Sequence, residues 1–246
     1  MILVRRNSDG SLFVIKRIFV EDQSEGEQND AMNEIRVLSS LSHPTVITYH
    51  GSFLEDGMLN VVMEYADNGS LFQHIQRARE PFPEARQSSG PPRVRGNNLT
   101  ASPPAPLQPI IISVFAQLTM ALKHLHSRKI LHRDIKTKNI FVTRSMQIKL
   151  GDFGLSKMLE SQVSFAQSAV GTPYYLSPEL CEGKPYNYKS DIWALGCVLY
   201  EMCTFRHAFD ATNLPALVLH IVQGQYQPIQ VQYSEQLKEA IASCLW

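Results

Sequence analysis

Four polar side chains that could share one reaction lie in two short stretches in the middle of the chain. The stretches are LHRDIKTKNIF, residues 131–141, and LGDFGLSK, residues 150–157. They carry Asp134, Lys136, Asn139 and Asp152 in loops beside short apolar runs that are typical of strands. The amide oxygen of Asn139 and the carboxylate of Asp152 suit a hard cation such as Mg²⁺, which takes its other ligands from water and phosphate. These residues predict a magnesium site, and Asp134 is then available to accept a proton.

A lysine near the start of the chain could supply positive charge to the same site. Lys16 lies in the run FVIKRIF, residues 13–19, whose apolar and β-branched residues predict a strand. An ammonium group inside such a run needs a nearby anion, because a buried charge without a partner is costly. We therefore expect an anion close to Lys16.

The surrounding pattern changes from strands to helices along the chain. Runs of β-branched and aromatic residues predict strands over 12–18, 47–54 and 58–65, and apolar spacing predicts one helix within 30–41. Helical spacing predicts further helices over 111–128 and 190–203, the second of them apolar on nearly every face. The sequence thus predicts an α+β protein with a sheet-rich first part and a mainly helical second part.

Composition narrows the class of protein. The 246 residues include 23 Lys plus Arg and 23 Asp plus Glu, so the net charge is zero and no basic field favours nucleic acid. No apolar run approaches the roughly 18 residues that would span a membrane. The four cysteines show no C-x-x-C pairing, which suits reduced thiols. We expect a cytosolic or nuclear protein with no membrane insertion and no nucleic-acid partner.

One proline-rich segment separates the two parts. Residues 81–109 hold 8 of the 14 prolines, with few apolar residues between them, so we expect a disordered insertion. P-x-x-P spacing occurs twice near its end, which is the pattern of a ligand for an SH3-type domain. A tolerated surface insertion without a partner is the alternative interpretation.

The order and spacing of the motifs resemble the eukaryotic protein kinases over nearly the whole chain outside 81–109. Asn139 follows Asp134 by 5 residues, and Asp152 follows it by 18. The matching motifs are Val14-Ile15-Lys16, Glu34, His132-Arg133-Asp134, Asp152-Phe153-Gly154 and, in the position of Ala-Pro-Glu, Ser177-Pro178-Glu179. The resemblance implies a bilobal fold, in which a small, mainly antiparallel sheet with one helix packs on a larger, mainly helical lobe.

The resemblance also implies a role for each of these residues in transferring phosphate from ATP. Asp134 would be the catalytic base, and Lys136 and Thr172 would lie beside it. Asn139 and Asp152 would bind Mg²⁺. Lys16, paired with Glu34, would hold the α and β phosphates. The sequence around Lys136 and the run VGTPYY, residues 170–175, are the forms seen in serine/threonine kinases, so protein Ser or Thr would be the acceptor.

Four further residues are expected to form the nucleotide pocket. Met63 resembles the gatekeeper, the backbone of Glu64 and Ala66 would bind adenine, and Phe141 would line the cavity. An ordinary core methionine is the alternative for Met63.

At finer grain, the run from Val170 to Met202 resembles the NIMA-related kinases, most closely the members that carry RCC1 repeats. That resemblance implies phosphorylation at Ser168 and a cytoplasmic location, with the cytoskeleton, centrosome or cilium as candidate sites. The alternative is Ser168 as an ordinary surface serine.

The chain departs from the family at both ends. Only fifteen residues precede Lys16, so we expect the first strand and the glycine-rich loop to be missing, and the last helices to be missing after Trp246. Residues 1–66 would be a partial small lobe with the hinge, and residues 67–246 a partial large lobe. The alternative to an active enzyme is therefore an impaired fragment or a pseudokinase-like binding module. A small-molecule kinase is a third interpretation.

Overall fold

The computed structural model describes residues 1–21, 35, 38–78, 110–152, 173–229 and 233–246. The expected roles of Glu34, Thr172 and Ser168 concern residues outside these ranges. So does the expected disorder of 81–109.

The first part of the chain forms a four-stranded antiparallel sheet, which contains the three predicted strands and one more at the start of the chain. Its strands are β1 (Ile2–Arg5), β2 (Leu12–Phe19), β3 (Tyr49–Glu55) and β4 (Met58–Glu64). They lie in the order β1-β2-β4-β3. Lys16 lies opposite Val61, so β4 is the neighbour that fixes its position. The predicted strand boundaries agree with the observed ones to within one or two residues.

A tight turn joins β1 to β2. Gly10 has a φ of 74°, which a glycine adopts without strain. The Asp9 carboxylate accepts a hydrogen bond from the Ser11 amide at 3.0 Å and pairs with the Arg6 guanidinium. These contacts fix the register that places Ile15 opposite Ile2 and therefore Lys16 on the other face of the strand.

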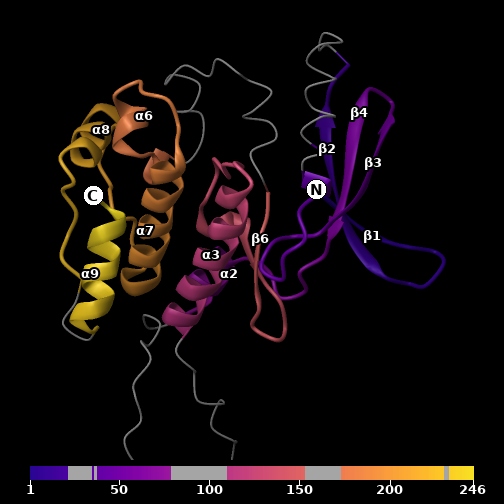
Figure 1. The fold of residues 1–246 in the computed structure, drawn as a ribbon, viewed down its shortest axis with the longest axis horizontal. Helices are drawn as coiled ribbons and strands as arrows, with labels where there is room; N and C mark the ends of the chain where they lie inside the picture. Colours follow the sequence, from indigo (N-terminus) through magenta and orange to yellow (C-terminus); the bar gives the residue numbers. More distant parts are fainter. Residues whose placement is uncertain (22–34, 36–37, 79–109, 153–172, 230–232) are drawn as a thin grey trace, which may run out of the picture.

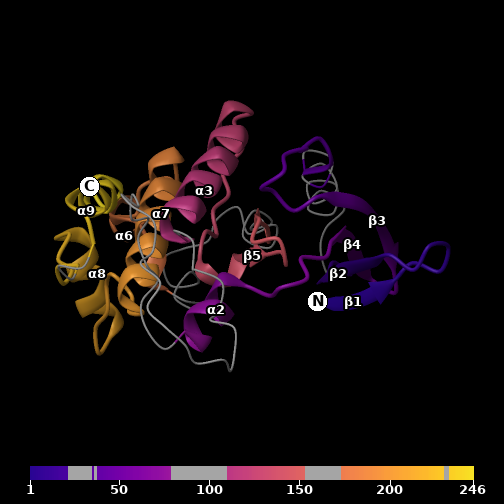
Figure 2. The ribbon, with the colours of Figure 1, turned by 90° about the horizontal axis from the view of Figure 1, so that it is seen from below.

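The second part of the chain is mainly helical. The α-helices are α2 (Leu71–Arg77), α3 (Ile110–Ser127), α6 (Pro178–Cys181), α7 (Tyr188–Thr204), α8 (Leu214–Val222) and α9 (Glu235–Cys244), with short 3-10 turns η1 (Thr137–Asn139) and η2 (Pro173–Tyr175). A two-stranded ribbon, β5 (Ile140–Val142) and β6 (Ile148–Leu150), pairs antiparallel. Both views show the sheet at one end of the molecule, the helices at the other and the ribbon between them (Figures 1 and 2). The bilobal α+β fold is confirmed.

Burial of two helices organises the helical part. Along α3 the buried residues recur at helical spacing, from Ile111 through Leu118 to Leu125. α7 is buried on nearly all faces, and Trp193 on it stacks on Phe209 with ring centres 5.1 Å apart. Removing such side chains from water contributes about 1.5–3 kcal/mol each, so the two helices form a rigid base for the loops above them.

Candidate active site

Three of the predicted residues meet in the loop between α3 and β5. The Lys136 ammonium donates to Oδ2 of Asp134 at 2.7 Å. The Asn139 amide nitrogen donates to the same oxygen at 2.7 Å and to the Asp134 carbonyl at 2.8 Å. Because one carboxylate oxygen receives a cation and an amide, Asp134 is held in one orientation and its charge is partly balanced.

Asp191, in the first turn of α7, holds the backbone of this loop in place. Asp191 accepts hydrogen bonds from the amides of His132 at 3.0 Å and Arg133 at 3.1 Å. Burial would raise the pKa of Asp191, but these donors and His126 outweigh it and lower the pKa, so the carboxylate is charged. Arg133 has a φ of 66°, a conformation unusual for a residue with a side chain, and these bonds stabilise it.

Asp191 could have served only to cap α7, but the helix already has a cap. The Asn187 side chain accepts from the helix backbone, and Ser190 completes a capping box. Asp191 is therefore available to hold the catalytic loop.

His132 connects that loop to the strand that carries Asp152. Burial lowers the pKa of His132, so its ring is neutral. Nδ1 accepts from the Asp134 amide at 3.3 Å, while Nε2 lies 3.2 Å from the Gly151 carbonyl and can donate to it. The neutral ring thus bridges both segments with one donor and one acceptor.

Asp152 lies two residues after the end of β6 and faces the sheet. The Gly151 amide donates to the Asn139 carbonyl at 3.0 Å, which places Asp152 beside the catalytic loop. Lys16, from β2, forms a salt bridge with Oδ1 of Asp152. Both side chains are mostly buried. The early lysine and the later carboxylate therefore meet across the two parts of the molecule.

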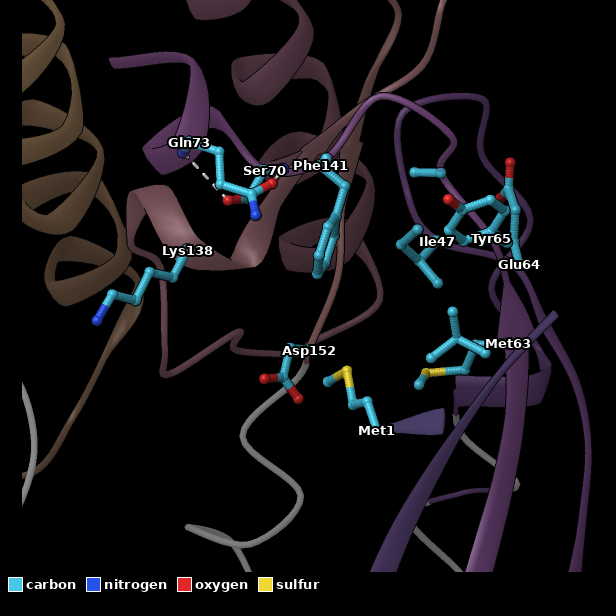
Figure 3. A pocket seen from close by; sticks show the side chains of 13 residues that line it. Met1, Ile47, Met63, Glu64, Tyr65, Ser70, Gln73, Lys138, Phe141 and Asp152 are labelled. Carbon is cyan, nitrogen blue, oxygen red and sulfur yellow. Dashed lines mark hydrogen bonds between the residues drawn. The ribbon is translucent and has the colours of Figure 1, made fainter. Parts of the chain in front are cut away.

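The space between the sheet and the ribbon is a pocket of about 250 Å³. Its lining includes Met63, Glu64, Ala66, Phe141 and Asp152, all expected from the sequence. Figure 3 shows Met63 on the side of the sheet, with Phe141 and Asp152 opposite. The volume lies just below the usual range of about 300–1,000 Å³ for ligand pockets, so it suits a flat ring better than a whole nucleotide.

Glu64, at the end of β4, anchors the segment that leaves the sheet. Its carboxylate pairs with the Lys149 ammonium at 2.7 Å and accepts from the Thr48 amide at 3.0 Å. Burial would raise the pKa of Glu64, but the bonds from Lys149 and Thr48 outweigh it and lower the pKa. The ion pair ties the edge of the pocket to β6 and hence to Asp152.

Some lining residues were not predicted. Val14 lies two residues before Lys16 and so on the same face of β2, a period-2 signal that could have found it. Ile47 and Lys138 also line the pocket. Ile47 packs closely against Gly151, which is about a hundred residues away in the sequence. Such a contact leaves no local pattern in the sequence.

The donor set fits the expected magnesium ion. The nitrogen of the Asn139 side chain makes both hydrogen bonds to Asp134, which leaves its amide oxygen as the atom able to bind a cation. Asp152 uses Oδ1 for Lys16, and its other carboxylate oxygen has the same capacity. Amide and carboxylate oxygens are the ligands that Mg²⁺ prefers. These two residues would hold it.

Known proteins resemble this chain throughout its length. It is 43% identical to "Serine/threonine-protein kinase Nek1" of Mus musculus over 98% of this chain and 18% of the relative. It is 46% identical to "Serine/threonine-protein kinase Nek8" of Danio rerio over 99% of this chain and 32% of the relative. "Probable serine/threonine-protein kinase nek3" of Dictyostelium discoideum is 45% identical, again over 99% of this chain and 20% of the relative. The chain thus spans about a fifth to a third of the length of these relatives.

A family model agrees with the geometry and with these relatives. The model for the protein kinase domain matches residues 1–245. This range includes Lys16, Asp134, Asn139 and Asp152. The chain therefore belongs to the protein kinase domain family.

Proposed function

We propose that this protein transfers the γ-phosphate of ATP to Ser or Thr hydroxyls of protein substrates. The observation that carries the proposal is a chain of contacts between the two parts of the fold. Lys16 pairs with Asp152, Gly151 before Asp152 bonds to Asn139, and Asn139 bonds to Asp134. Asp152 also lines the pocket. The relatives named above are serine/threonine-protein kinases, which favours a hydroxyl acceptor of that type.

The residues divide the work between orientation and proton transfer. The hydroxyl of the substrate would donate to Asp134, which accepts the proton as the hydroxyl oxygen bonds to the γ-phosphorus. The bond from that phosphorus to the bridging oxygen of ADP breaks in the same transfer, and ADP leaves. Lys136 would donate to the same carboxylate and to the transferred phosphoryl oxygens. Asn139 and Asp152 would hold Mg²⁺, which when bound would offset the negative charge of the phosphates. Lys16 would exchange part of its contact with Asp152 for phosphate oxygens.

The experiment that tests this function removes the base without changing its size. Asp134→Asn should lower phosphate transfer from labelled ATP to a protein substrate by about 10²- to 10⁴-fold, the usual contribution of a general base. Asp56→Asn is the matched control, because Asp56 lies in a turn with a φ of 50°, which asparagine tolerates. Equal transfer by the wild type and by Asp134→Asn would overturn the proposal.

We also propose finer assignments for the chain as a whole. Residues 1–66 would be a partial small lobe with its hinge, and 67–246 a partial large lobe that carries 81–109 as an insertion. In support, the sheet ends at Glu64 and the next helix begins at Leu71.

The narrower family and its location belong to the same proposal. The relatives favour the NIMA-related group, and the run from Val170 to Met202 favours the members with RCC1 repeats. A cytoplasmic protein near the cytoskeleton, centrosome or cilium would follow. No helix among the described residues is both long and apolar enough to cross a membrane. Fluorescence imaging of a tagged chain would test the location, and pull-down with SH3 domains would test a partner for 81–109.

A further inference from the structure

Lys138 has no assigned role, although it lies between two catalytic-loop residues. It belongs to η1, between Lys136 and Asn139, and its side chain is exposed. Lys138 is one of the residues that line the first pocket, and Figure 3 shows its side chain extending away from Asp152 and Phe141. Its ammonium lies 4.9 Å from the centre of the Phe72 ring. Among the described residues it forms no salt bridge, so its charge is available to a ligand.

Phe72 also lines a second, larger cavity next to the catalytic loop. This cavity has a volume of about 840 Å³ and lies between α2, the end of α7 and α8. Its charged and titratable lining residues are Glu201, Arg206, His207, Asp210 and His220. Because Phe72 lines this cavity and the Lys138 ammonium lies 4.9 Å from the centre of its ring, the ammonium lies near the edge of the cavity.

The carboxylates of this cavity are already engaged. Oε1 of Glu201 accepts from the Thr137 hydroxyl at 3.2 Å, and Oε2 accepts from the Tyr175 hydroxyl. Burial raises the pKa of Glu201, which weakens its charge further. Asp210 accepts from the Ala211 amide at 2.9 Å. Glu201 is therefore poorly placed to select a basic side chain of a ligand, whereas Asp210 is exposed in the chain segment that follows α7.

The positively charged side chains near this cavity are more accessible to a ligand than the Glu201 carboxylate. Lys138 and Arg206 are both exposed. Burial lowers the pKa of His207, and its ring is therefore neutral at pH 7. Lys138 lies in the catalytic loop only four residues after Asp134, so it is the first of these cations that a ligand held at Asp134 would meet.

We propose that Lys138 is a specificity-determining residue that favours protein substrates with an Asp or Glu close in sequence to the acceptor Ser or Thr. The proposal rests on the kinase function proposed above. With its hydroxyl at Asp134, an extended peptide advances about 3.3 Å per residue. A side chain a few residues from the acceptor therefore reaches the edge of the cavity where Lys138 lies, and a carboxylate there forms an ion pair with it.

The test swaps charge on both sides of the contact. Each peptide contains one serine and carries Glu, Gln or Lys at one position near that serine. The position is varied from peptide to peptide. Binding is measured by fluorescence anisotropy, and kcat/KM is measured for phosphorylation, both with the full chain. At the peptide position that contacts Lys138, the kcat/KM of the wild type should be about twofold to fivefold higher for Glu than for Gln, as expected of a partly exposed ion pair. Lys138→Met should remove this preference, and Lys138→Glu should transfer it to the Lys peptide. The wild-type preference should fall as salt rises.

The matched control is Lys123→Met, an exposed lysine on α3, which should keep the wild-type preference. A preference for Glu that survives in Lys138→Met, or no charge preference in the wild type, would overturn the role of Lys138 while peptide phosphorylation continues. No binding and no phosphorylation of any peptide would instead overturn the proposed function. Melting temperature separates these results from misfolding, because substitution of an exposed lysine should leave it unchanged.

Discussion

Among single residues, Lys149 makes the most clearly testable contribution to stability. Its side chain is only 10% exposed and pairs with the Glu64 carboxylate. Lys149→Met would leave that carboxylate partly buried without its cation, which costs about 1–3 kcal/mol of the free energy of unfolding. Urea unfolding measures the loss. Lys238→Met is the control, because its partner Glu235 is 77% exposed and such pairs contribute under about 1 kcal/mol.

The contribution of this pair should also depend on pH in a defined direction. The folded pKa of Glu64 lies below its ordinary value of 4.5, so the carboxylate contributes stability that is fully present above that value. It is lost as the pH falls through the folded pKa, because protonation removes the charge that Lys149 binds. The destabilisation caused by Lys149→Met should therefore shrink between about pH 5 and about pH 3. A constant difference in unfolding free energy across that range would contradict this assignment.

At the scale of elements, the end of β6 shows how close packing places a functional residue. A Cβ atom on Gly151 would lie 2.5 Å from Cγ1 of Ile47, which is too close for either residue to remain in place. Gly151→Ala should lower the free energy of unfolding by about 1–3 kcal/mol and weaken nucleotide binding, because Asp152 moves with the strand. Gly51→Ala, in β3, is the control, since nothing lies within 4 Å of the added atom. Equal melting temperatures for the two variants would show that β6 adjusts freely.

The start of α7 makes a second prediction at this scale. Asp191→Asn keeps the shape of the side chain, but one of the two backbone amides that Asp191 binds would face an amide nitrogen. Phosphate transfer should fall by about 10- to 100-fold, as expected when a catalytic group is slightly misplaced. The helix should persist, because Asn187 and Ser190 cap it. Circular dichroism and the transfer rate measured together check this. Glu235→Gln, in the first turn of α9, should change neither.

The same elements show which parts of the fold the sequence could predict. β2 and β4 were predicted because β-branched runs bounded by turn residues carry a local signal. α3 and α7 are long enough, at 18 and 17 residues, for their apolar spacing to be clear. α2 and α8 have only 7 and 9 residues, and their boundaries depend on packing rather than on periodicity.

The residues of the candidate site also divide into those with a local sequence pattern and those placed by tertiary contacts. Asp134, Lys136 and Asn139 could be predicted together because their separation along the chain is short and their chemistry is distinctive. Glu64 was expected only through its backbone, because the ion pair with Lys149 joins strands 85 residues apart. Lys138 was not singled out, since its direction is set by Phe72 from another helix. Such contacts depend on tertiary structure and have no local pattern.

For the whole molecule, the contact between Lys16 and Asp152 joins the sheet to the helical part at the place where nucleotide would bind. A ligand that binds only the folded protein stabilises it, by about 2.7 kcal/mol at a concentration 100 times Kd. For a chain of this length that corresponds to a rise of about 5–10 °C in Tm. Mg-ATP should therefore raise Tm markedly.

The size of that rise should depend on the cation on β2. Lys16→Met should reduce the rise caused by Mg-ATP, because the variant keeps the pocket but loses the charge that meets the phosphates. Arg17→Met, the next residue on the opposite face of the strand, should keep it. Chelation of Mg²⁺ should reduce the rise in both the wild type and Arg17→Met, since Asn139 and Asp152 would then lack the ion that links them to phosphate. An equal rise for Lys16→Met and Arg17→Met would mean that the two parts of the fold do not meet around a nucleotide.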